Sequence, residues 1–182
     1  MRKLTDFMDE IGITNQIIAG LGKLVNEDKA LDILETMDDW RVVTNHRSTT
    51  RHGQCRYRTK ELELHAMLHK PGNEAARDRV TIHEIAHVVA PLVYGQFIKG
   101  HGREWKHIMR CFGASPDRCC SSNDEMNQFK LKKAKIIYAC SRCEREFPAQ
   151  RKKKYGLEHY IHKRCGGHLY LKENRVTGYR AP

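Results

Sequence analysis

The sequence predicts an α+β fold in two parts: a small domain with helices packed on a short antiparallel sheet, followed by a smaller basic C-terminal domain. Three observations lead to this prediction. Hydrophobic spacing is by turns helical and strand-like, one apolar helix carries two histidines a turn apart, and cysteine pairs and positive charge concentrate near the C-terminus. The 182 residues suit one medium domain with a small satellite, and we place the two domains at residues 1–129 and 130–182.

Composition narrows the class of protein. A hydrophobic content of 40% is enough for a folded core and excludes a disordered chain. No apolar run approaches the length of a membrane span, and Asp6, Asp9 and Glu10 interrupt the apolar stretch that a signal peptide would need. The odd number of cysteines, 7, fits metal ligation in a reducing compartment better than a disulfide framework. We therefore expect a cytoplasmic protein, nuclear in a eukaryotic host, with no membrane partner.

The individual elements follow from the same spacing. Apolar residues at helical intervals predict one or two amphipathic helices between Thr14 and Met37. The strand-like segments are 40–43, 54–58 and 62–65, with turns expected at 45–50 and at Gly53. Good helix formers predict a long helix that starts near Asn73, and a second helix is expected at 102–112.

The long helix contains the pattern H-E-x-x-H, formed by His83, Glu84 and His87. One turn separates the histidines, so both imidazoles can reach the same metal ion from one face. Glu84 can address a water bound to that metal, as in zinc hydrolases. The alternative is a solvated helix that merely holds two histidines. Apolar neighbours argue against it, because buried ionisable groups are costly unless something binds them.

A catalytic zinc site needs a third protein ligand and keeps its fourth position for water. We favour His101, because the glycines on both sides give its backbone freedom at the start of the second helix. Glu104, a carboxylate on the second helix, is the alternative ligand, but we assign it a supporting or packing role. His107 is a weaker third candidate, expected at the surface of the same helix. The continuation found in metzincins is absent, since Ala90 and Val93 occupy its Gly and His positions.

The C-terminal domain carries a second candidate metal site. A C-x-x-C pair and a later H-x-x-C pair supply four ligands for a closed structural zinc site of the ribbon type, Cys140, Cys143, His162 and Cys165. His168 is the alternative to His162, because Cys165 also begins a C-x-x-H. A redox C-x-x-C is disfavoured, since no βαβ pattern surrounds it. The other cysteines are expected to be core or loop thiols: Cys55, Cys111, Cys119 and Cys120.

The net positive charge belongs entirely to this second domain. Residues 130–182 contain 15 Lys and Arg against 4 Asp and Glu, whereas the rest of the chain has 18 of each. A basic module beside a neutral body is typical of polyanion binding, and interleaved tyrosines suit single-stranded DNA, whose bases can stack on them. A solvated tail, with the tyrosines in a small core, is the alternative. The candidate contacts are Arg151, Lys152, Lys153, Lys154, Lys163 and Arg164.

Two separated signatures resemble those of the SprT-like metallopeptidases, the family that includes the Spartan proteases. These are the pattern from His83 to His87 and the later run Gly-His-Gly-Arg-Glu-Trp at 100–105. The segment 40–68 resembles the family's small sheet and the basic segment resembles its zinc ribbon, although His162 stands where the family usually has cysteine. The resemblance spans roughly residues 14–171. It implies a zincin-like metallopeptidase domain and proteolysis of proteins bound or crosslinked to DNA.

The sequence thus predicts a zinc endopeptidase with one catalytic and one structural zinc ion. His83, His87 and His101 would hold the catalytic zinc, and Glu84 would act as the general base. DNA, above all single-stranded DNA, and the proteins on it are the expected partners. The alternative from another class is a catalytically silent DNA-binding regulator with the same fold, and a third interpretation is a hydrolase of non-protein substrates.

Two further expectations concern the substrate. An edge strand at 62–65 is expected to hold the peptide backbone by strand addition. Arg103 or Tyr94 is a candidate to stabilise the oxyanion.

Overall fold

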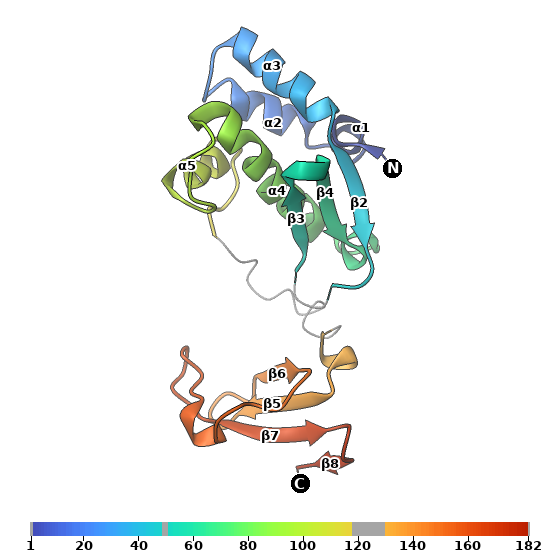
Figure 1. Ribbon diagram of the computed structural model, residues 1–182, viewed down its shortest axis with the longest axis vertical. Helices are drawn as coiled ribbons and strands as arrows, with labels where there is room; N and C mark the ends of the chain where they lie inside the picture. The colour runs from blue at the N-terminus through green and yellow to red at the C-terminus, as the bar shows by residue number, and fades with distance from the viewer. Residues whose placement is uncertain (1, 49–50, 118–129, 182) are drawn as a thin grey trace. The chain divides into compact units, whose positions relative to one another are not determined.

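The computed structural model describes residues 2–48, 51–117 and 130–181 (Figure 1). It divides into two units, Met1–Ser121 and Ser122–Pro182, and two separate sheets are present. The predicted boundary between residues 129 and 130 adjoins the segment 118–129, which lies outside the described residues together with Cys119 and Cys120. Among the described helices, none combines the length and the apolar character that a bilayer crossing requires.

The first unit begins with the short strand β1 (Arg2–Lys3) and three helices, α1 (Leu4–Glu10), α2 (Thr14–Leu21) and α3 (Glu27–Asp38). Helices α2 and α3 confirm the amphipathic helices predicted after Thr14. The start of α3 follows from local chemistry, because the Asn26 side chain accepts a hydrogen bond from the Lys29 N–H at 3.1 Å.

The sheet of the first unit is mixed, which corrects the prediction of an antiparallel sheet. Its further strands are β2 (Arg41–Asn45), β3 (Gly53–Arg56) and β4 (Glu61–His65), in the order β1-β2-β4-β3. Strands β2 and β4 are parallel, while the other pairs are antiparallel. The reason is the path of the chain: it runs from β2 to the far side of the sheet and returns through the 3-10 helix η1 (Tyr57–Thr59) to place β4 in the gap.

This topology also moves the open edge of the sheet. Segment 62–65 was expected at an edge, but β4 is hydrogen-bonded on both sides, and β3 is the outer strand among those described. Gly53 begins β3 and does not form the predicted turn. On β4, Leu62 and Leu64 are fully buried in the core, whereas Glu63 on the opposite face forms an ion pair with Arg56.

The long helix α4 (Glu74–Tyr94) is the centre of the first unit. Its start confirms the prediction near Asn73, which is the N-cap residue. It contacts β3, β4 and the following helix α5 (Arg103–Cys111), so residues on several sides of its middle are buried, and Figure 1 shows it between the sheet and α5. The 3-10 helix η2 (Ala66–His69) leads from β4 towards it.

The second unit is a small antiparallel sheet in the order β6-β5-β7-β8. Its strands are β5 (Ile136–Cys140), β6 (Glu146–Ala149), β7 (Leu169–Asn174) and β8 (Tyr179–Arg180), with the 3-10 helix η3 (Leu157–His159) between β6 and β7. All five residues of β5 are buried, whereas β6 is half-buried and β8 exposed. So small an apolar core is consistent with a need for a metal staple.

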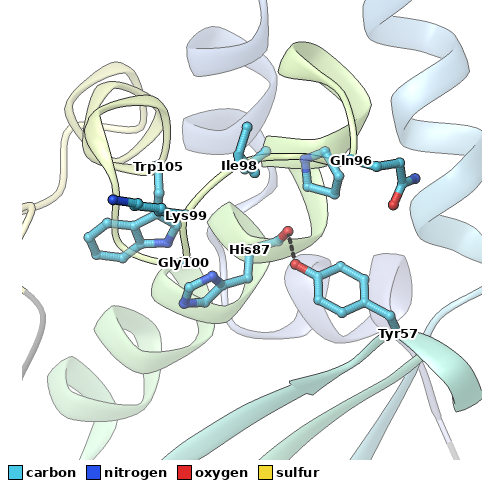
Figure 2. A pocket seen from close by; sticks show the side chains of 9 residues that line it. Tyr57, His87, Gln96, Ile98, Lys99, Gly100 and Trp105 are labelled. Atoms are coloured by element: carbon cyan, nitrogen blue, oxygen red, sulfur yellow. Dashed lines mark hydrogen bonds between the residues drawn. The ribbon is translucent and has the colours of Figure 1, made fainter.

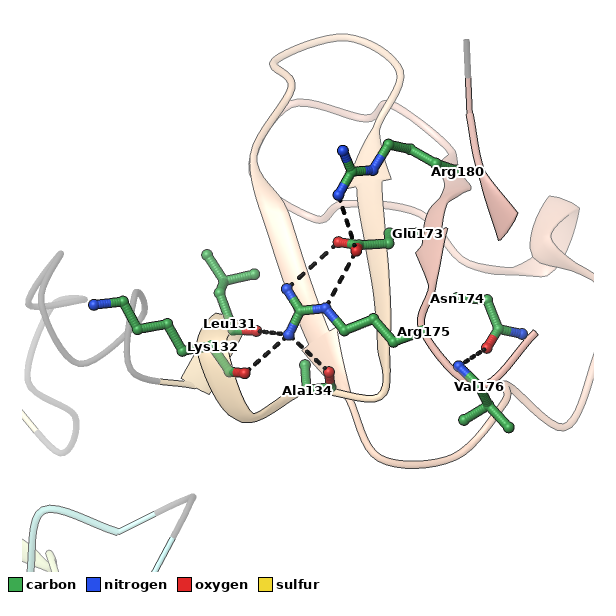
Figure 3. A network of polar contacts seen from close by, with 8 residues as sticks. All are labelled: Leu131, Lys132, Ala134, Glu173, Asn174, Arg175, Val176 and Arg180. Atoms are coloured by element: carbon green, nitrogen blue, oxygen red, sulfur yellow. Dashed lines mark hydrogen bonds and ion pairs between the residues drawn. The ribbon is translucent and has the colours of Figure 1, made fainter. Parts of the chain in front are cut away.

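Arg175 connects the helical turn that precedes β5 to Glu173 on strand β7 (Figure 3). The guanidinium of Arg175 donates to the carbonyls of Leu131, Lys132 and Ala134 at 2.8, 2.9 and 3.0 Å, at the end of a helical turn that precedes β5. Its other nitrogens lie 3.3 and 3.4 Å from the carboxylate of Glu173. The three carbonyls share the hydrogens of one nitrogen, Nη1, while Nε and Nη2 of the planar fork face the carboxylate.

We expect Arg175→Lys to destabilise the second unit by about 1–3 kcal/mol, because a single ammonium cannot satisfy three carbonyls and a carboxylate together. Thermal unfolding of the zinc-loaded chain checks this. Arg164→Lys is the matched control, since Arg164 is exposed and no polar partner is recorded for its side chain within the described ranges. Equal unfolding temperatures for both variants would contradict the role given to Arg175.

Candidate metal centres

Three histidine nitrogens converge at the first candidate metal centre. Helix α4 presents His83 and His87 one turn apart, and His101 lies just before α5. The Nε2 atom of His101 is 2.9 Å from Nε2 of His83 and 3.1 Å from Nε2 of His87. A tetrahedral zinc ion with bonds of about 2.0–2.1 Å holds its nitrogen ligands about 3.3 Å apart. The group is therefore able to hold a metal ion, and its donor set fits zinc.

The backbone at His101 is special, in a way that the sequence only partly indicated. The expected freedom of the flanking glycines is not what turns the chain, because His101 itself adopts the left-handed conformation, with φ 61°. Gly102 is required for a different reason: a Cβ there would lie 2.8 Å from the carbonyl oxygen of Lys99. The close turn and the left-handed residue together aim the imidazole of His101 at α4.

Trp105 holds the three imidazoles in place. Its side chain is fully buried, and its ring centroid lies 4.7 Å from those of His83 and His101 and 5.4 Å from that of His87, where the planes are stacked. Its indole N–H also points at the backbone carbonyl of His83, at 3.4 Å. A metal site whose ligands are packed in this way has little freedom to relax.

The two helix histidines are held in the form that binds metals. Burial lowers the pKa of His83 to about 4 and that of His87 to about 3, and the neighbouring His101 adds to both shifts. Both rings are thus neutral at physiological pH, and a neutral imidazole offers a nitrogen lone pair to a metal.

Glu84 faces strand β3. Only 7% of it is exposed, and burial raises the pKa of its carboxyl to about 7 against the opposing effect of a hydrogen bond from the Cys55 backbone. Strand β3 can approach so closely because it has no side chain at Gly53: a Cβ there would lie 2.9 Å from Cγ and Oε1 of Glu84 and 2.8 Å from Val80. The backbone of β3 thus forms one wall around this carboxyl group.

A tyrosine compensates for a proline in α4. Pro91 has no N–H to donate to the carbonyl of His87, four residues earlier. The Tyr57 hydroxyl donates to that carbonyl instead, at 2.6 Å. Tyr57, in the turn that follows β3, is thereby fixed beside the second histidine of the group.

The other candidates for this site lie apart from the three nitrogens. Glu104 does not join the metal-binding group and is half-buried near Arg103, whose side chain is 95% exposed. His107 forms a 2.6 Å hydrogen bond with the hydroxyl of Tyr94. Arg103 and Tyr94, the two candidates for oxyanion stabilisation, therefore have their recorded contacts with Glu104 and His107 and not with the three histidine nitrogens.

The second candidate centre lies in the C-terminal unit and contains the four predicted ligands. Sγ of Cys140 is 3.4 Å from Sγ of Cys165, which is 3.6 Å from Sγ of Cys143 and 3.1 Å from Nδ1 of His162. The four donor atoms form a group able to hold a metal ion, and three thiolates with one imidazole suit zinc. His168, the alternative ligand, turns its Nδ1 to the carbonyl of Glu158 at 3.1 Å.

The backbone around this second centre favours metal binding. Burial would raise the pKa of the Cys140 thiol, but hydrogen bonds from the backbone of Arg142 and Cys143 outweigh it and lower the pKa to about 6. At Gly167 a Cβ would lie 2.5 Å from Sγ of Cys140, so only glycine allows the second ligand pair to approach the first. A thiolate is the form of cysteine that binds zinc.

Helices on a small sheet, an H-E-x-x-H helix and a third histidine before the next helix define a zincin-like fold, here with a candidate zinc ribbon. A family model described as the SprT-like family matches residues 14–125, and the chain belongs to that family. It is similar to Protein SprT of Pseudomonas fluorescens strain Pf-5, with 32% identity over 123 residues, 63% of this chain and 71% of that protein. Protein SprT of Pseudomonas putida strain GB-1 is 35% identical over 121 residues, with the same coverage. The family match ends before the candidate ribbon.

Sequence reasoning missed the roles of Trp105, Tyr57 and Gly53 at the first centre. Trp105 lies four residues after His101 and in the first turn of α5, so an aromatic residue this close to the third histidine was a usable signal. Pro91 lies four residues after His87 and signalled a free carbonyl, but nothing in the sequence identified Tyr57 as its partner. Gly53 was noticed and misplaced in a turn, because its close approach to Glu84 is a tertiary feature.

We expect the wild-type chain to bind two zinc ions, and His101→Ala and Cys143→Ala to bind about one each, because each substitution removes a ligand from a different site. Metal analysis after dialysis against a weak chelator gives the stoichiometry.

His107→Ala and His168→Ala are the matched controls, one per site, and both should retain two zinc ions. Loss of one zinc from His168→Ala, with retention in His162→Ala, would reverse the ligand assignment in the ribbon.

Proposed function

We propose that this chain is a zinc-dependent metallopeptidase that hydrolyses peptide bonds of proteins bound or crosslinked to DNA. The observation that carries the proposal is the convergence of the Nε2 atoms of His83, His87 and His101, together with a buried carboxyl group on the same turn of α4. Membership of the SprT-like family supports it. The compartment we propose is the cytoplasm, or the nucleus of a eukaryotic host.

The residues divide the chemistry between them. His83, His87 and His101 would hold zinc, which when bound polarises the substrate carbonyl and lowers the pKa of a water ligand to about 7. Glu84 takes a proton from the attacking water as the new C–O bond forms, and returns it to the nitrogen of the leaving amine as the C–N bond breaks. In the metal-free chain burial raises the pKa of this carboxyl to about 7, and a group poised near the working pH can accept a proton and release it.

The exposed edge of β3 is the proposed dock for the substrate backbone. Within the described residues this strand pairs on one side only, with β4, and its backbone lies against Glu84. A peptide added to this edge would run past the general base with its carbonyls and N–H groups paired. Strand β3 thus takes the role that the sequence had suggested for segment 62–65.

The basic C-terminal unit is the proposed DNA-binding element. Lys153 Nζ lies 4.8 Å from the ring centre of Tyr160, and Lys154 Nζ 5.4 Å from that of Tyr155. Tyr155 is 61% exposed, so its ring is open to stacking by a base while the lysines meet phosphates.

Charge pairing helps to choose between the cations of this unit. Arg175 and Arg180 both pair with Glu173, so they are engaged in the fold. The proposed contacts are Arg151, Lys152, Lys153, Lys154, Lys163 and Arg164, for none of which an ion pair with a carboxylate of the described residues is recorded.

We expect Glu84→Gln to reduce cleavage about 10²–10⁴-fold, because the amide cannot accept the water's proton. Cleavage of a DNA-binding protein, with and without single-stranded DNA, measures this, and zinc content checks that the ligands are intact. Cleavage that needs both Glu84 and DNA supports the proposal. Equal cleavage with and without DNA would support the peptidase activity but contradict a role of the basic unit in it. DNA binding by a zinc-loaded chain that cleaves nothing would favour the catalytically silent regulator.

We expect Gly53→Ala to lower activity about 10²-fold without loss of zinc, because the new Cβ would push Glu84 away from β3, and small displacements of a catalytic group have effects of this size. Peptide hydrolysis and metal content of the purified variant test it. Gly22→Ala is the control, since a Cβ there meets nothing closer than 3.8 Å and should leave activity unchanged. Wild-type rates in Gly53→Ala would show that β3 does not position Glu84.

A further inference from the structure

A pocket of about 390 Å³ opens next to the first metal centre (Figure 2). His87 forms part of its wall, so the pocket is continuous with the site at which a peptide bond would be cleaved. Figure 2 shows Trp105 and Tyr57 on opposite sides of His87, facing this space. The volume lies in the range of about 300–1,000 Å³ typical of pockets that bind small ligands, which is ample for one large side chain.

The walls of the pocket are apolar and come from three parts of the chain. Ala90 and Pro91 belong to α4, Ile98 to the loop between α4 and α5, and Trp105 to α5. The ring of Tyr57 completes the wall from the side of the sheet. An apolar side chain that binds against such a lining is stabilised by the burial of apolar surface. A polar group buried there would find few hydrogen-bond partners.

Two walls are already fixed before any substrate arrives. The hydrogen bond from Tyr57 to the His87 carbonyl orients the tyrosine ring, and full burial immobilises Trp105. The side chains of a preformed pocket lose little further conformational entropy when a ligand binds. The pocket therefore has the properties of a specificity site.

The rim adds a charge preference. Lys99 and Gln96 lie at the opening and are exposed, and no acidic residue lines the pocket within the described part of the chain. A lysine or arginine side chain would meet the like charge of Lys99 with no carboxylate in the lining to offset it.

We propose that this pocket binds a large apolar side chain, such as Leu, Met, Phe or Tyr, of one of the two residues that flank the cleaved bond, and that Lys99 excludes Lys and Arg. The assignment rests on the proposed peptidase function. It adds a substrate preference to that function, read from the residues around His87.

Mapping of cleavage sites by mass spectrometry tests the proposal. The zinc-loaded full chain is incubated with single-stranded DNA and a peptide library that samples both flanking positions. We expect at least tenfold enrichment of large apolar residues over glycine at one position, with Lys and Arg depleted there.

Three variants make the test specific. Ile98→Trp fills the pocket and should shift the preference to Ala and Gly. Lys99→Glu should restore cleavage at Lys and Arg, and it tests the rim even where Ile98→Trp folds poorly. Phe97→Trp adds bulk at the neighbouring residue, which is fully exposed and does not line the pocket, and it should keep the wild-type preference.

The outcomes separate the two proposals. Cleavage with no preference at either flanking position, or a preference unchanged in both Ile98→Trp and Lys99→Glu, overturns the pocket assignment and leaves the peptidase standing. Absence of cleavage by the zinc-loaded wild type overturns the proposed function and this assignment with it.

Discussion

The approach of His101 to helix α4 is the constraint on which the rest of the first unit depends. The Nε2 atom of His101 lies 2.9 and 3.1 Å from those of His83 and His87. His101 reaches them in a left-handed backbone conformation, which costs about 1–3 kcal/mol. Trp105 supports this arrangement, because it packs on all three rings and anchors α5 in the core. The junction between α4 and α5 thus positions the histidine side chains for metal binding at the cost of backbone strain at His101.

The opposite side of α4 meets a second constraint, the burial of Glu84. A carboxyl group enclosed by protein needs a polar neighbour, and the backbone of β3 supplies one at Cys55. That contact is possible only because Gly53 lets the strand come close. The helix therefore presents its metal-ligating histidines and its carboxyl group to different neighbours, α5 for the former and the sheet for the latter.

The sequence predicted those features that depend on residues near one another along the chain. The start of α4 followed from the residues after Pro71. The zincin-like fold class with a candidate ribbon followed from the resemblance carried by the H-E-x-x-H pattern, the later histidine and the cysteine pairs. The parallel pairing of β2 and β4 and the edge position of β3 could not be predicted, because strand order depends on how distant segments pack. The contact of Tyr57 with His87 was hidden for the same reason, since thirty residues separate the partners. The metal ligands and the DNA contacts stay predictions.

The bond between Tyr57 and the His87 carbonyl gives the site a mechanical property. Tyr57 follows β3 directly, and His87 belongs to the group of metal-binding nitrogens. A rigid link of 2.6 Å thus joins the strand edge to the backbone of a ligand. The strand edge proposed to bind the peptide and the backbone of a metal-binding residue are therefore coupled through one hydroxyl group.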